Sequence, residues 1–347
     1  MTEFHIEHVN LSRERNVHEI KRFLERFDLN FDTDVDFTVA VRDGEGTLVG
    51  TGSSRGEVLR NIAVDENIQG AGLTSSILSA LIQNLSRKNV LHYFIFTRPE
   101  KAFLFVNLGF AEIARAEPYA SLLESGLGSV AAYCESIAGE TARLPQKRAA
   151  VVMNANPFTK GHRALVEQAA AEYPGVVVFV VSEDKSLFPF ADRMRLIKEG
   201  VSDLANVAVV PGGKYIISAA TFPTYFTRER DRVKAQTRLD IALFASQIAP
   251  KLGIAARYIG EEPYCPVTAE YNEAMIEILV PAGVSVHVAP RIPVNHEMVS
   301  ASKVREAIRI DDWKTVEMMV PPTTFVYLRS EEKKDILENI RSSNSRH

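Results

Sequence analysis

The stretch that decides the fold is AAVVMNANPFTKGH, residues 149–162. Its first part, 149–153, is an apolar run without alternation, which is typical of a parallel strand buried on both faces. Pro157 stiffens the turn that follows, Gly161 lets the backbone approach a ligand closely, and a helix is expected to begin next to His162. A strand, a turn and a helix in this order predict the start of a doubly wound α/β domain.

The same alternation of strand and helix continues downstream. A second apolar run, VVVFVV at 176–181, again lacks polar alternation and predicts another buried parallel strand. Ligands of such sheets bind outside the carboxyl ends of the strands. We expect strands at 176–182, 207–210, 256–260 and 285–288, and helices at 162–173, 191–200, 237–248, 268–279 and 302–310.

The first 130 residues show strands and helices in mixed order. Strands are expected at 37–41, 47–51, 58–64 and 92–97 and from 109 onward, with helices at 17–27, 73–85 and 102–107. The length of 347 residues exceeds what one hydrophobic core usually serves. We therefore predict an α+β domain at 1–138, a polar linker at 139–148, a parallel-sheet (Rossmann-like) domain at 149–330, and a C-terminal helix and tail at 331–347.

The composition excludes several classes of function. The net charge is −4 without a long basic tract, so nucleic acid is not an expected partner. The two cysteines, Cys134 and Cys265, stand outside any metal-ligand spacing and fit a reducing compartment. The polar N-terminus carries no signal core, and no apolar run is long enough to span a membrane. We expect a cytoplasmic protein without a metal site made by its own side chains.

Residues 154–162 are predicted to bind a polyphosphate. A helix N-terminus offers unpaired N–H donors and about +0.5 of an elementary charge. Thr159 adds a hydroxyl and His162 an imidazole N–H. The alternative is an ordinary strand-to-helix turn in which Thr159 caps the helix and His162 is merely exposed. Further contacts to the nucleotide are expected from Asn154, Asn156, Phe158 and Gly161.

A second segment of the same kind is VSASKVR, residues 299–305. Ser300 or Ser302 would cap the helix that follows, a role that serine favours in any protein. The segment also brings Lys303 and Arg305 to this second helix start. Two helix N-termini with added cations at one sheet edge would hold both ends of a polyphosphate.

These two segments resemble the (H/T)xGH and ISSTxxR signatures of the adenylyltransferase superfamily, with Val299 and Ser302 replacing Ile and Thr. The resemblance implies that an oxyanion attacks the α-phosphate of ATP and expels pyrophosphate. His162, with Thr159, would stabilise the pentacovalent phosphorus. Arg305 and Ser302 would hold the β- and γ-phosphates, and Mg²⁺ would bridge the oxygens. Lys303 would join His162, Thr159 and Arg305 as a catalytic residue. Asn156 stands where many members carry Asp.

The loops at the ends of the strands supply further candidates for ligand contacts. The charged residues among them could equally be solvated surface charges without a ligand. Cys265 reads as a packed thiol, since no histidine base lies near it in the sequence. ATP contacts are expected from Gly260 and Glu261, and substrate or phosphate contacts from Lys185, Arg193, Lys214, Tyr215 and Arg291.

The N-terminal region contains a glycine turn between a strand and a helix, QGAGL at 69–73. It resembles the acyl-CoA loop of the GNAT acetyltransferases, (Q/R)xxGx(G/A), with Asn67 at the first position. KAFLFVNLGF at 101–110 resembles the last helix of that family and the strand start after it. Glu57 and Asp65 look like ordinary solvated carboxylates, so binding of a CoA-like arm is favoured over acetyl transfer. The resemblance implies arm contacts from Ile62, Val64, Gly70, Gly72, Leu73 and Asn107.

A GNAT-like domain ahead of this nucleotidyltransferase domain resembles the citrate lyase ligase family, as do the segments 182–200, 214–226 and 258–268. The resemblance implies that ATP and acetate give acetyl adenylate. The thiol of a dephospho-CoA-derived prosthetic group, on the acyl carrier subunit of citrate lyase, then takes the acetyl group.

Two other functions stay open on the sequence. One is an adenylyltransferase that forms a nucleotide cofactor. The other is a GNAT-type protein acetyltransferase whose nucleotide domain is regulatory.

Overall fold

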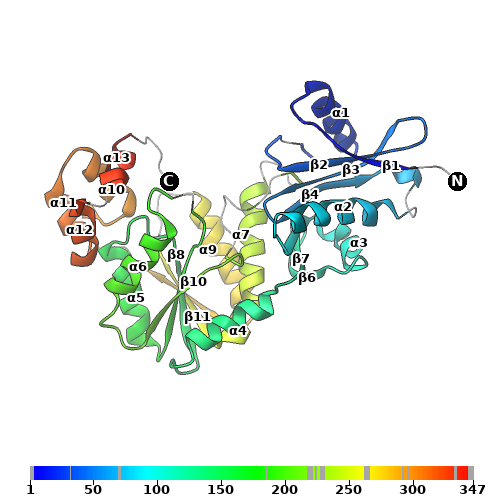
Figure 1. The fold of residues 1–347 in the computed structure, drawn as a ribbon. Helices are drawn as coiled ribbons and strands as arrows, with labels where there is room; N and C mark the ends of the chain where they lie inside the picture. The colour runs from blue at the N-terminus through cyan, green and yellow to red at the C-terminus, as the bar shows by residue number, and fades with distance from the viewer. Residues whose placement is uncertain are drawn as a thin grey trace. The chain divides into compact units, whose positions relative to one another are not determined.

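The computed structural model describes residues 4–31, 33–68, 72–184, 186–216, 222, 225–226, 231–261, 266–290, 293–294, 297–331 and 334–342. It divides into two compact units (Figure 1). Unit 1 comprises Met1–Ala132 and Phe222–Leu239, and unit 2 comprises Tyr133–Thr221 and Asp240–His347. No helix in the part of the chain that the structure describes is both long enough and apolar enough to cross a membrane.

Unit 1 is built on a mixed seven-stranded sheet of order β1-β2-β3-β4-β5-β7-β6. Its neighbouring strands are antiparallel except β4 and β5, which are parallel. The apolar side of helix α2, with Ile77 and Leu81 fully buried, packs on β2, β3 and β4. The elements are β1 His5–His8, α1 Glu14–Glu25, β2 Phe37–Arg42, β3 Leu48–Arg55, β4 Val58–Val64, α2 Leu73–Arg87, β5 His92–Thr97, α3 Ala102–Val106, β6 Ala111–Ala116 and β7 Ala120–Gly126.

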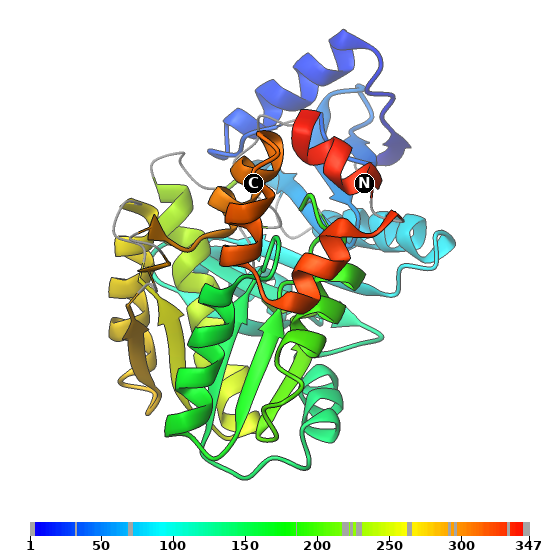
Figure 2. The same ribbon diagram turned by 90° about the vertical axis from the view of Figure 1, so that its left-hand side faces the viewer.

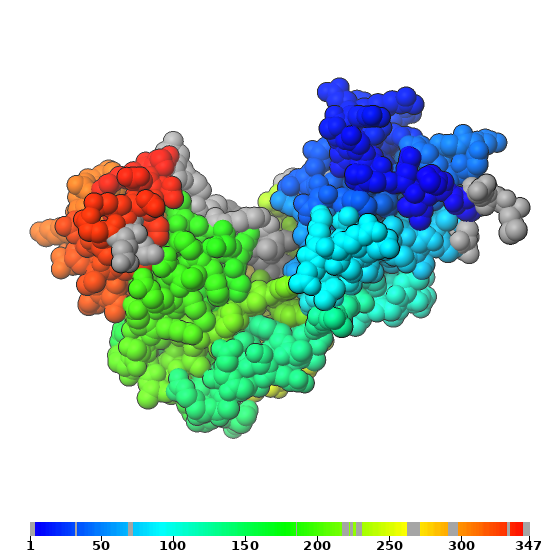
Figure 3. Space-filling view, in the orientation of Figure 1, coloured from blue at the N-terminus to red at the C-terminus, as the bar shows by residue number. Residues whose placement is uncertain are grey.

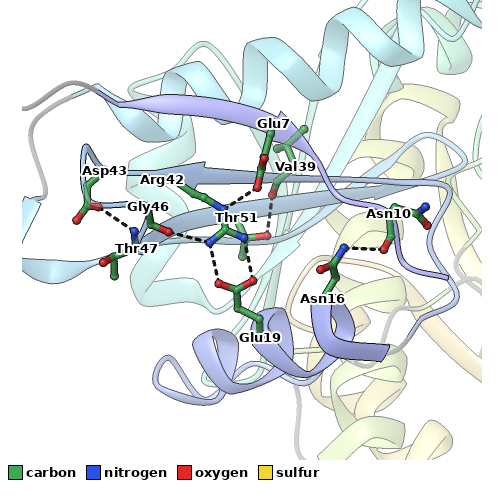
Figure 4. A network of polar contacts seen from close by, with 10 residues as sticks. All are labelled: Glu7, Asn10, Asn16, Glu19, Val39, Arg42, Asp43, Gly46, Thr47 and Thr51. Atoms are coloured by element: carbon green, nitrogen blue, oxygen red, sulfur yellow. Dashed lines mark hydrogen bonds and ion pairs between the residues drawn. The ribbon is translucent and has the colours of Figure 1, made fainter. Parts of the chain in front are cut away.

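An arginine joins the first elements of unit 1 (Figure 4). Arg42 on β2 makes a two-pronged ion pair with Glu19 of α1, at 2.7 and 2.8 Å, and its Nε donates to Glu7 of β1 at 2.6 Å. These bonds hold the pKa of the Glu19 carboxyl below its ordinary value and raise the pKa of Arg42. The helix α1 is therefore fixed to the sheet by charge as well as by its apolar side.

Strands β4 and β5 form a fork. They pair only at Val58–Phe94 and Leu59–Ile95, after which they diverge. The Tyr225 hydroxyl donates to the Phe96 carbonyl at 2.5 Å, just past the last pair. The Arg60 guanidinium lies 4.9 Å from the centre of the same phenol ring. Tyr225 therefore fills the point at which the two strands separate.

Unit 2 is built on a five-stranded parallel sheet of order β10-β9-β8-β11-β12. Figure 1 shows α5 and α6 on one face and α4 and α9 on the other. This doubly wound arrangement, with the α+β unit 1, confirms the predicted fold class. The main elements are α4 Val130–Glu140, β8 Arg148–Met153, α5 Lys160–Glu172, β9 Val176–Val180, α6 Phe190–Gly200, β10 Val207–Pro211, η4 Phe244–Ile248, α8 Ala249–Leu252, β11 Ile254–Gly260, α9 Pro266–Leu279 and β12 Ser285–Ala289. Helix α7, Arg232–Leu243, begins in unit 1 and ends in unit 2.

A layer of four helices completes unit 2. Helix α10 contacts α11 and α13, and α12 contacts α6. Figures 1 and 2 show the four helices grouped together, and Figure 3 shows their atoms (orange to red) against residues of the α/β layer (green). Their bounds are α10 Ala301–Arg309, α11 Trp313–Met319, α12 Pro322–Arg329 and α13 Lys334–Ser342.

The compact units differ from the expected domains in two places. The predicted linker 139–148 does not lie between the two units but within unit 2: it covers the end of α4 at Glu140, a largely exposed connection, and the first residue of β8, Arg148. The buried Arg148 guanidinium binds the carbonyls of Thr141, Leu144 and Pro145, which folds this segment onto unit 2. In addition, residues 222–239 group with unit 1. Strands β1 and β7 and helix α4 were not expected from the sequence, and of the tail, 343–347 lies outside the described residues.

Candidate active site

A cavity of about 650 Å³ lies at the carboxyl end of β8, where helices α5 and α10 begin. The two helix starts are adjacent, since a Cβ placed on Gly161 would lie 3.6 Å from the Val299 carbonyl oxygen. The structure thus brings the two predicted phosphate segments together. The predicted site residues that line this cavity are Asn154, Asn156, Thr159, Gly161, His162, Gly260, Glu261, Ser300, Ser302 and Arg305.

Thr159 and His162 bind each other at the start of α5. The Thr159 hydroxyl accepts the His162 backbone N–H at 3.3 Å, and the Thr159 N–H donates to His162 Nδ1 at 3.1 Å. Since Nδ1 accepts a hydrogen bond, the ring proton is on Nε2. Burial lowers the pKa of His162 from 6.5 to about 4. At neutral pH the imidazole is therefore uncharged, with Nε2–H as its donor. Thr159 caps the helix, as it would in an ordinary strand-to-helix turn, and the same hydrogen bonds orient the His162 ring.

Phe158 lies outside the cavity, contrary to the prediction of a nucleotide contact. Its ring is fully buried and stacks on the His162 imidazole, with centroids 5.9 Å apart and an interplanar angle of 14°. Gly200 also lies against the ring, since a Cβ placed on it would come within 2.5 Å of one ring carbon. Because Phe158 is fully buried and has little room to move, it supports the imidazole that stacks on it.

The start of α10 is capped by Ser300, whose hydroxyl accepts the Lys303 N–H at 3.2 Å and lies 3.0 Å from the Ser302 hydroxyl. Arg305 is only 4% exposed, and its Nη1 donates to the Asn156 carbonyl at 2.6 Å. Burial lowers the pKa of Arg305, and this residue lines the cavity, where a cation favours the binding of an anion. Lys303 does not line the cavity, so its predicted catalytic role stays a prediction.

Arg193 has a different place from the one expected. It is fully buried, and its guanidinium donates to the Phe188 and Val181 carbonyls at 3.0 and 2.7 Å and to Asn154 Oδ1 at 2.7 Å. Burial lowers its pKa. Because these donors are used within the protein, Arg193 holds the loop after β9 onto Asn154 instead of contacting a ligand.

The remaining candidates divide into three groups. Glu261 continues the strand pairing, since its N–H donates to the Ala289 carbonyl at 2.9 Å. Lys214 is exposed and Tyr215 packs on Tyr133 with ring centres 5.1 Å apart; neither lines the cavity. Lys185 and Arg291 lie outside the described residues.

Among the described residues, no group of three or more His, Cys, Asp or Glu side chains is placed to hold a metal ion.

Unit 1 contains a second cavity, of about 380 Å³, in the fork between β4 and β5. The predicted arm contacts Ile62, Val64, Gly72 and Leu73 line it, whereas Asn107 does not and Gly70 lies outside the described residues. The further lining residues that sequence reasoning missed include Arg60, Tyr225 and Phe226. The signal available for the last two was that the segment 214–226 fits the resembled family.

The backbone of β4 offers hydrogen-bonding groups to this fork. The Asp65 N–H donates to the Val49 carbonyl on the β3 side. Because an antiparallel ladder alternates, Ile62 and Val64 direct their N–H and C=O groups to the opposite edge, where the paired stretch of β5 has ended. The only carboxylate among the described residues that line the fork is Glu66. This pocket is thus suited to bind an extended chain with amide groups. None of the described residues that line it is a histidine or a cysteine.

Comparison with known proteins identifies the family. The model of the citrate lyase ligase C-terminal domain matches residues 148–328. The [citrate [pro-3S]-lyase] ligase of Klebsiella pneumoniae is 40% identical over 89% of this chain and 91% of its own length, and that of Escherichia coli K12 is 35% identical over 93% of each.

Solved structures show weaker likeness. The ribosomal-protein-S18-alanine N-acetyltransferase of Escherichia coli covers 37% of this chain and 96% of its own, with 17% identity and a TM-score of 0.29. Thermotoga maritima TmcAL bound with alpha-thio ATP covers 55% and 57%, with 12% identity and a TM-score of 0.39. The assignment depends on the family model and the two relatives: this chain belongs to the citrate lyase ligase family and is an enzyme of the ligase class.

Proposed function

We propose that this chain activates citrate lyase by ATP-dependent acetylation of the acyl carrier subunit of the lyase. The observation that supports this most directly is the unit 2 cavity, where two helix N-termini and Arg305 surround a neutral His162. Helix N-termini bind phosphates through free N–H groups and a positive dipole end. The cavity is therefore suited to the polyphosphate of ATP.

In the first step an acetate oxygen attacks the α-phosphorus of ATP. The bond from this phosphorus to the pyrophosphate oxygen breaks, and its electron pair leaves with pyrophosphate. Negative charge grows on the α-phosphate oxygens, and the Nε2–H of His162 donates to one of them without giving up its proton. A preorganised donor of this kind contributes about 3 kcal/mol to lowering the barrier. The product, acetyl adenylate, is a mixed anhydride and hence a good acyl donor.

Magnesium is proposed to enter with ATP. Mg²⁺ usually keeps several waters and is bound through substrate phosphates together with one or two carboxylates. Glu261 is the only acid among the described residues that line the cavity. The residues present thus fit ATP, whose phosphates would supply most of the ligands to the metal.

In the second step the thiol of the prosthetic group attacks the acetyl carbonyl. The carbon–oxygen bond of the anhydride breaks, AMP leaves with the electron pair, the thiol proton goes to solvent, and a thioester remains on the carrier. We propose that the dephospho-CoA-derived arm of the carrier is held in the fork of unit 1. Its amides would pair with the backbone of Ile62 and Val64, and its phosphates would lie at the start of α2, beside Gly72.

The test is acetylation of deacetylated citrate lyase by the full chain with ATP, Mg²⁺ and acetate. We expect AMP and pyrophosphate in equal amounts and recovery of lyase activity. Pyrophosphate exchange into ATP that does not need acetate would instead indicate a cofactor-forming adenylyltransferase. Acetyl transfer from acetyl-CoA without ATP would indicate a protein acetyltransferase. Either result contradicts the proposal.

A further inference from the structure

Asn156 presents a fixed amide group to the unit 2 cavity. The side chain is only 6% exposed, and its Oδ1 accepts the Phe188 N–H at 3.1 Å. Because Oδ1 takes this bond, the amide nitrogen Nδ2 occupies the other position of the group. Nδ2 has no hydrogen-bond partner among the described residues. Asn156 lines the cavity, so a ligand there can reach this residue. A nearly buried donor of this kind normally has a partner, which a bound ligand would supply here.

Apolar residues at the end of β8 contribute to the lining of this cavity. Met153 and Ala155, at the carboxyl end of β8, line the same cavity and are 6% and 2% exposed. Val152 also lines it and is half-buried. An amide donor next to a small apolar surface complements a molecule with a carboxylate at one end and a short alkyl group at the other.

The charge at this place also suits an acid. The Asn156 amide is neutral, and its backbone carbonyl accepts from the Arg305 guanidinium. A carboxylate substrate therefore meets a donor and a nearby cation there. In the proposed reaction the phosphates of ATP would have other partners in the same cavity, at His162 and at the start of α10.

We propose that Asn156, with Met153 and Ala155, forms the subsite for acetate. Nδ2 donates to the carboxylate oxygen that does not attack, and the methyl group lies on the apolar wall. The inference deepens the proposed function and rests on it. It also names the chemical class selected, a short unbranched carboxylate.

The first test is the Asn156→Asp variant of the full chain, assayed by acetate-dependent exchange of pyrophosphate into ATP. One oxygen of the new Asp side chain can still accept the Phe188 N–H. The other oxygen takes the place of the donor Nδ2, and the carboxylate brings a negative charge to this position. We expect the KM for acetate to rise at least ~30-fold, while the KM for ATP stays within about threefold. The matched control is Asn154→Asp, since the amide of Asn154 is already bound by Ser186 and Arg193. In Asn154→Asp the KM for acetate and the KM for ATP should change by similar factors.

The second test is Ala155→Gly, which also serves if the Asp variant does not fold. Ala155 has a φ of +52°, a conformation that glycine adopts readily, so the backbone tolerates the change. Removing this methyl group makes room for one more carbon. We expect the ratio of kcat/KM for propionate to that for acetate to rise about tenfold.

Three results would overturn the subsite. One is an equal rise of both KM values in Asn156→Asp, which would place this amide on a nucleotide phosphate. Another is an acetate KM within twofold of that of the unsubstituted chain. The third is an unchanged propionate ratio in Ala155→Gly. Absence of acetate-dependent exchange in the unsubstituted chain has a different meaning, because it would refute the proposed function itself.

Discussion

Replacing Gly200 by Ala tests whether the position of the His162 imidazole depends on the Phe158 ring that stacks on it. The new Cβ would lie 2.5 Å from one carbon of Phe158 and 2.9 Å from the next. Ordinary carbon–carbon contact needs ~3.5 Å, so the ring must move by about 1 Å. Phe158 is fully buried and stacks on His162, so the imidazole is expected to move with it. A displacement of about 1 Å in a catalytic group costs up to ~100-fold in rate.

The effect on stability should be smaller than the effect on rate. Overpacking costs about 1–3 kcal/mol, and alanine recovers up to about 1 kcal/mol of helix propensity. Gly139→Ala is the matched control, because a Cβ at this helical position in α4 meets nothing within 4 Å. Acetyl adenylate formation, trapped with hydroxylamine, and urea unfolding are measured for both variants. Adenylation in Gly200→Ala within twofold of the unsubstituted chain would refute this dependence on Phe158.

Three further predictions follow from the same geometry. His162→Ala should slow adenylation at least ~100-fold in single-turnover measurements, and a loss below tenfold would contradict the donor role. Because folding lowers the pKa of His162 from 6.5 to about 4, the unfolded chain binds the extra proton between these values. The free energy of unfolding should therefore fall as pH drops through this window, and His162→Gln should flatten that slope in urea titrations. Arg42→Ala should lower the unfolding free energy by about 1–3 kcal/mol, whereas Arg115→Ala, which breaks a more exposed ion pair, should lower it by less than about 1 kcal/mol; equal losses would argue against the network of Arg42.

The parallel sheet was largely readable from the sequence, because the run at Val176–Val180 is apolar on both faces and has few alternatives to a buried strand. The two phosphate segments were readable for a related reason. A helix start needs a cap and a close turn whatever the rest of the fold does, so Thr159 and Ser300 mark both starts locally.

The features that could not be predicted from the sequence depend on contacts between residues and their packing in the fold. Arg148 and Arg193 look like surface charges in the sequence, yet both are buried because irregular backbone nearby offers carbonyls to bind. Phe158 stands in the signature but points into the core, against Gly200. Tyr225 belongs by sequence to the crossover after β10 and by packing to the fork of β4 and β5.

This placement of Tyr225 bears on how the enzyme can be taken apart. Unit 1 is a discontinuous domain, so a single cut after residue 138 does not release it intact. The excised fragment would lack the hydroxyl that binds the Phe96 carbonyl and the ring that lies against Arg60. A gene split at that point is therefore expected to yield a damaged N-terminal fragment. Testing the cavity of each unit by itself therefore requires point substitutions in an otherwise whole chain.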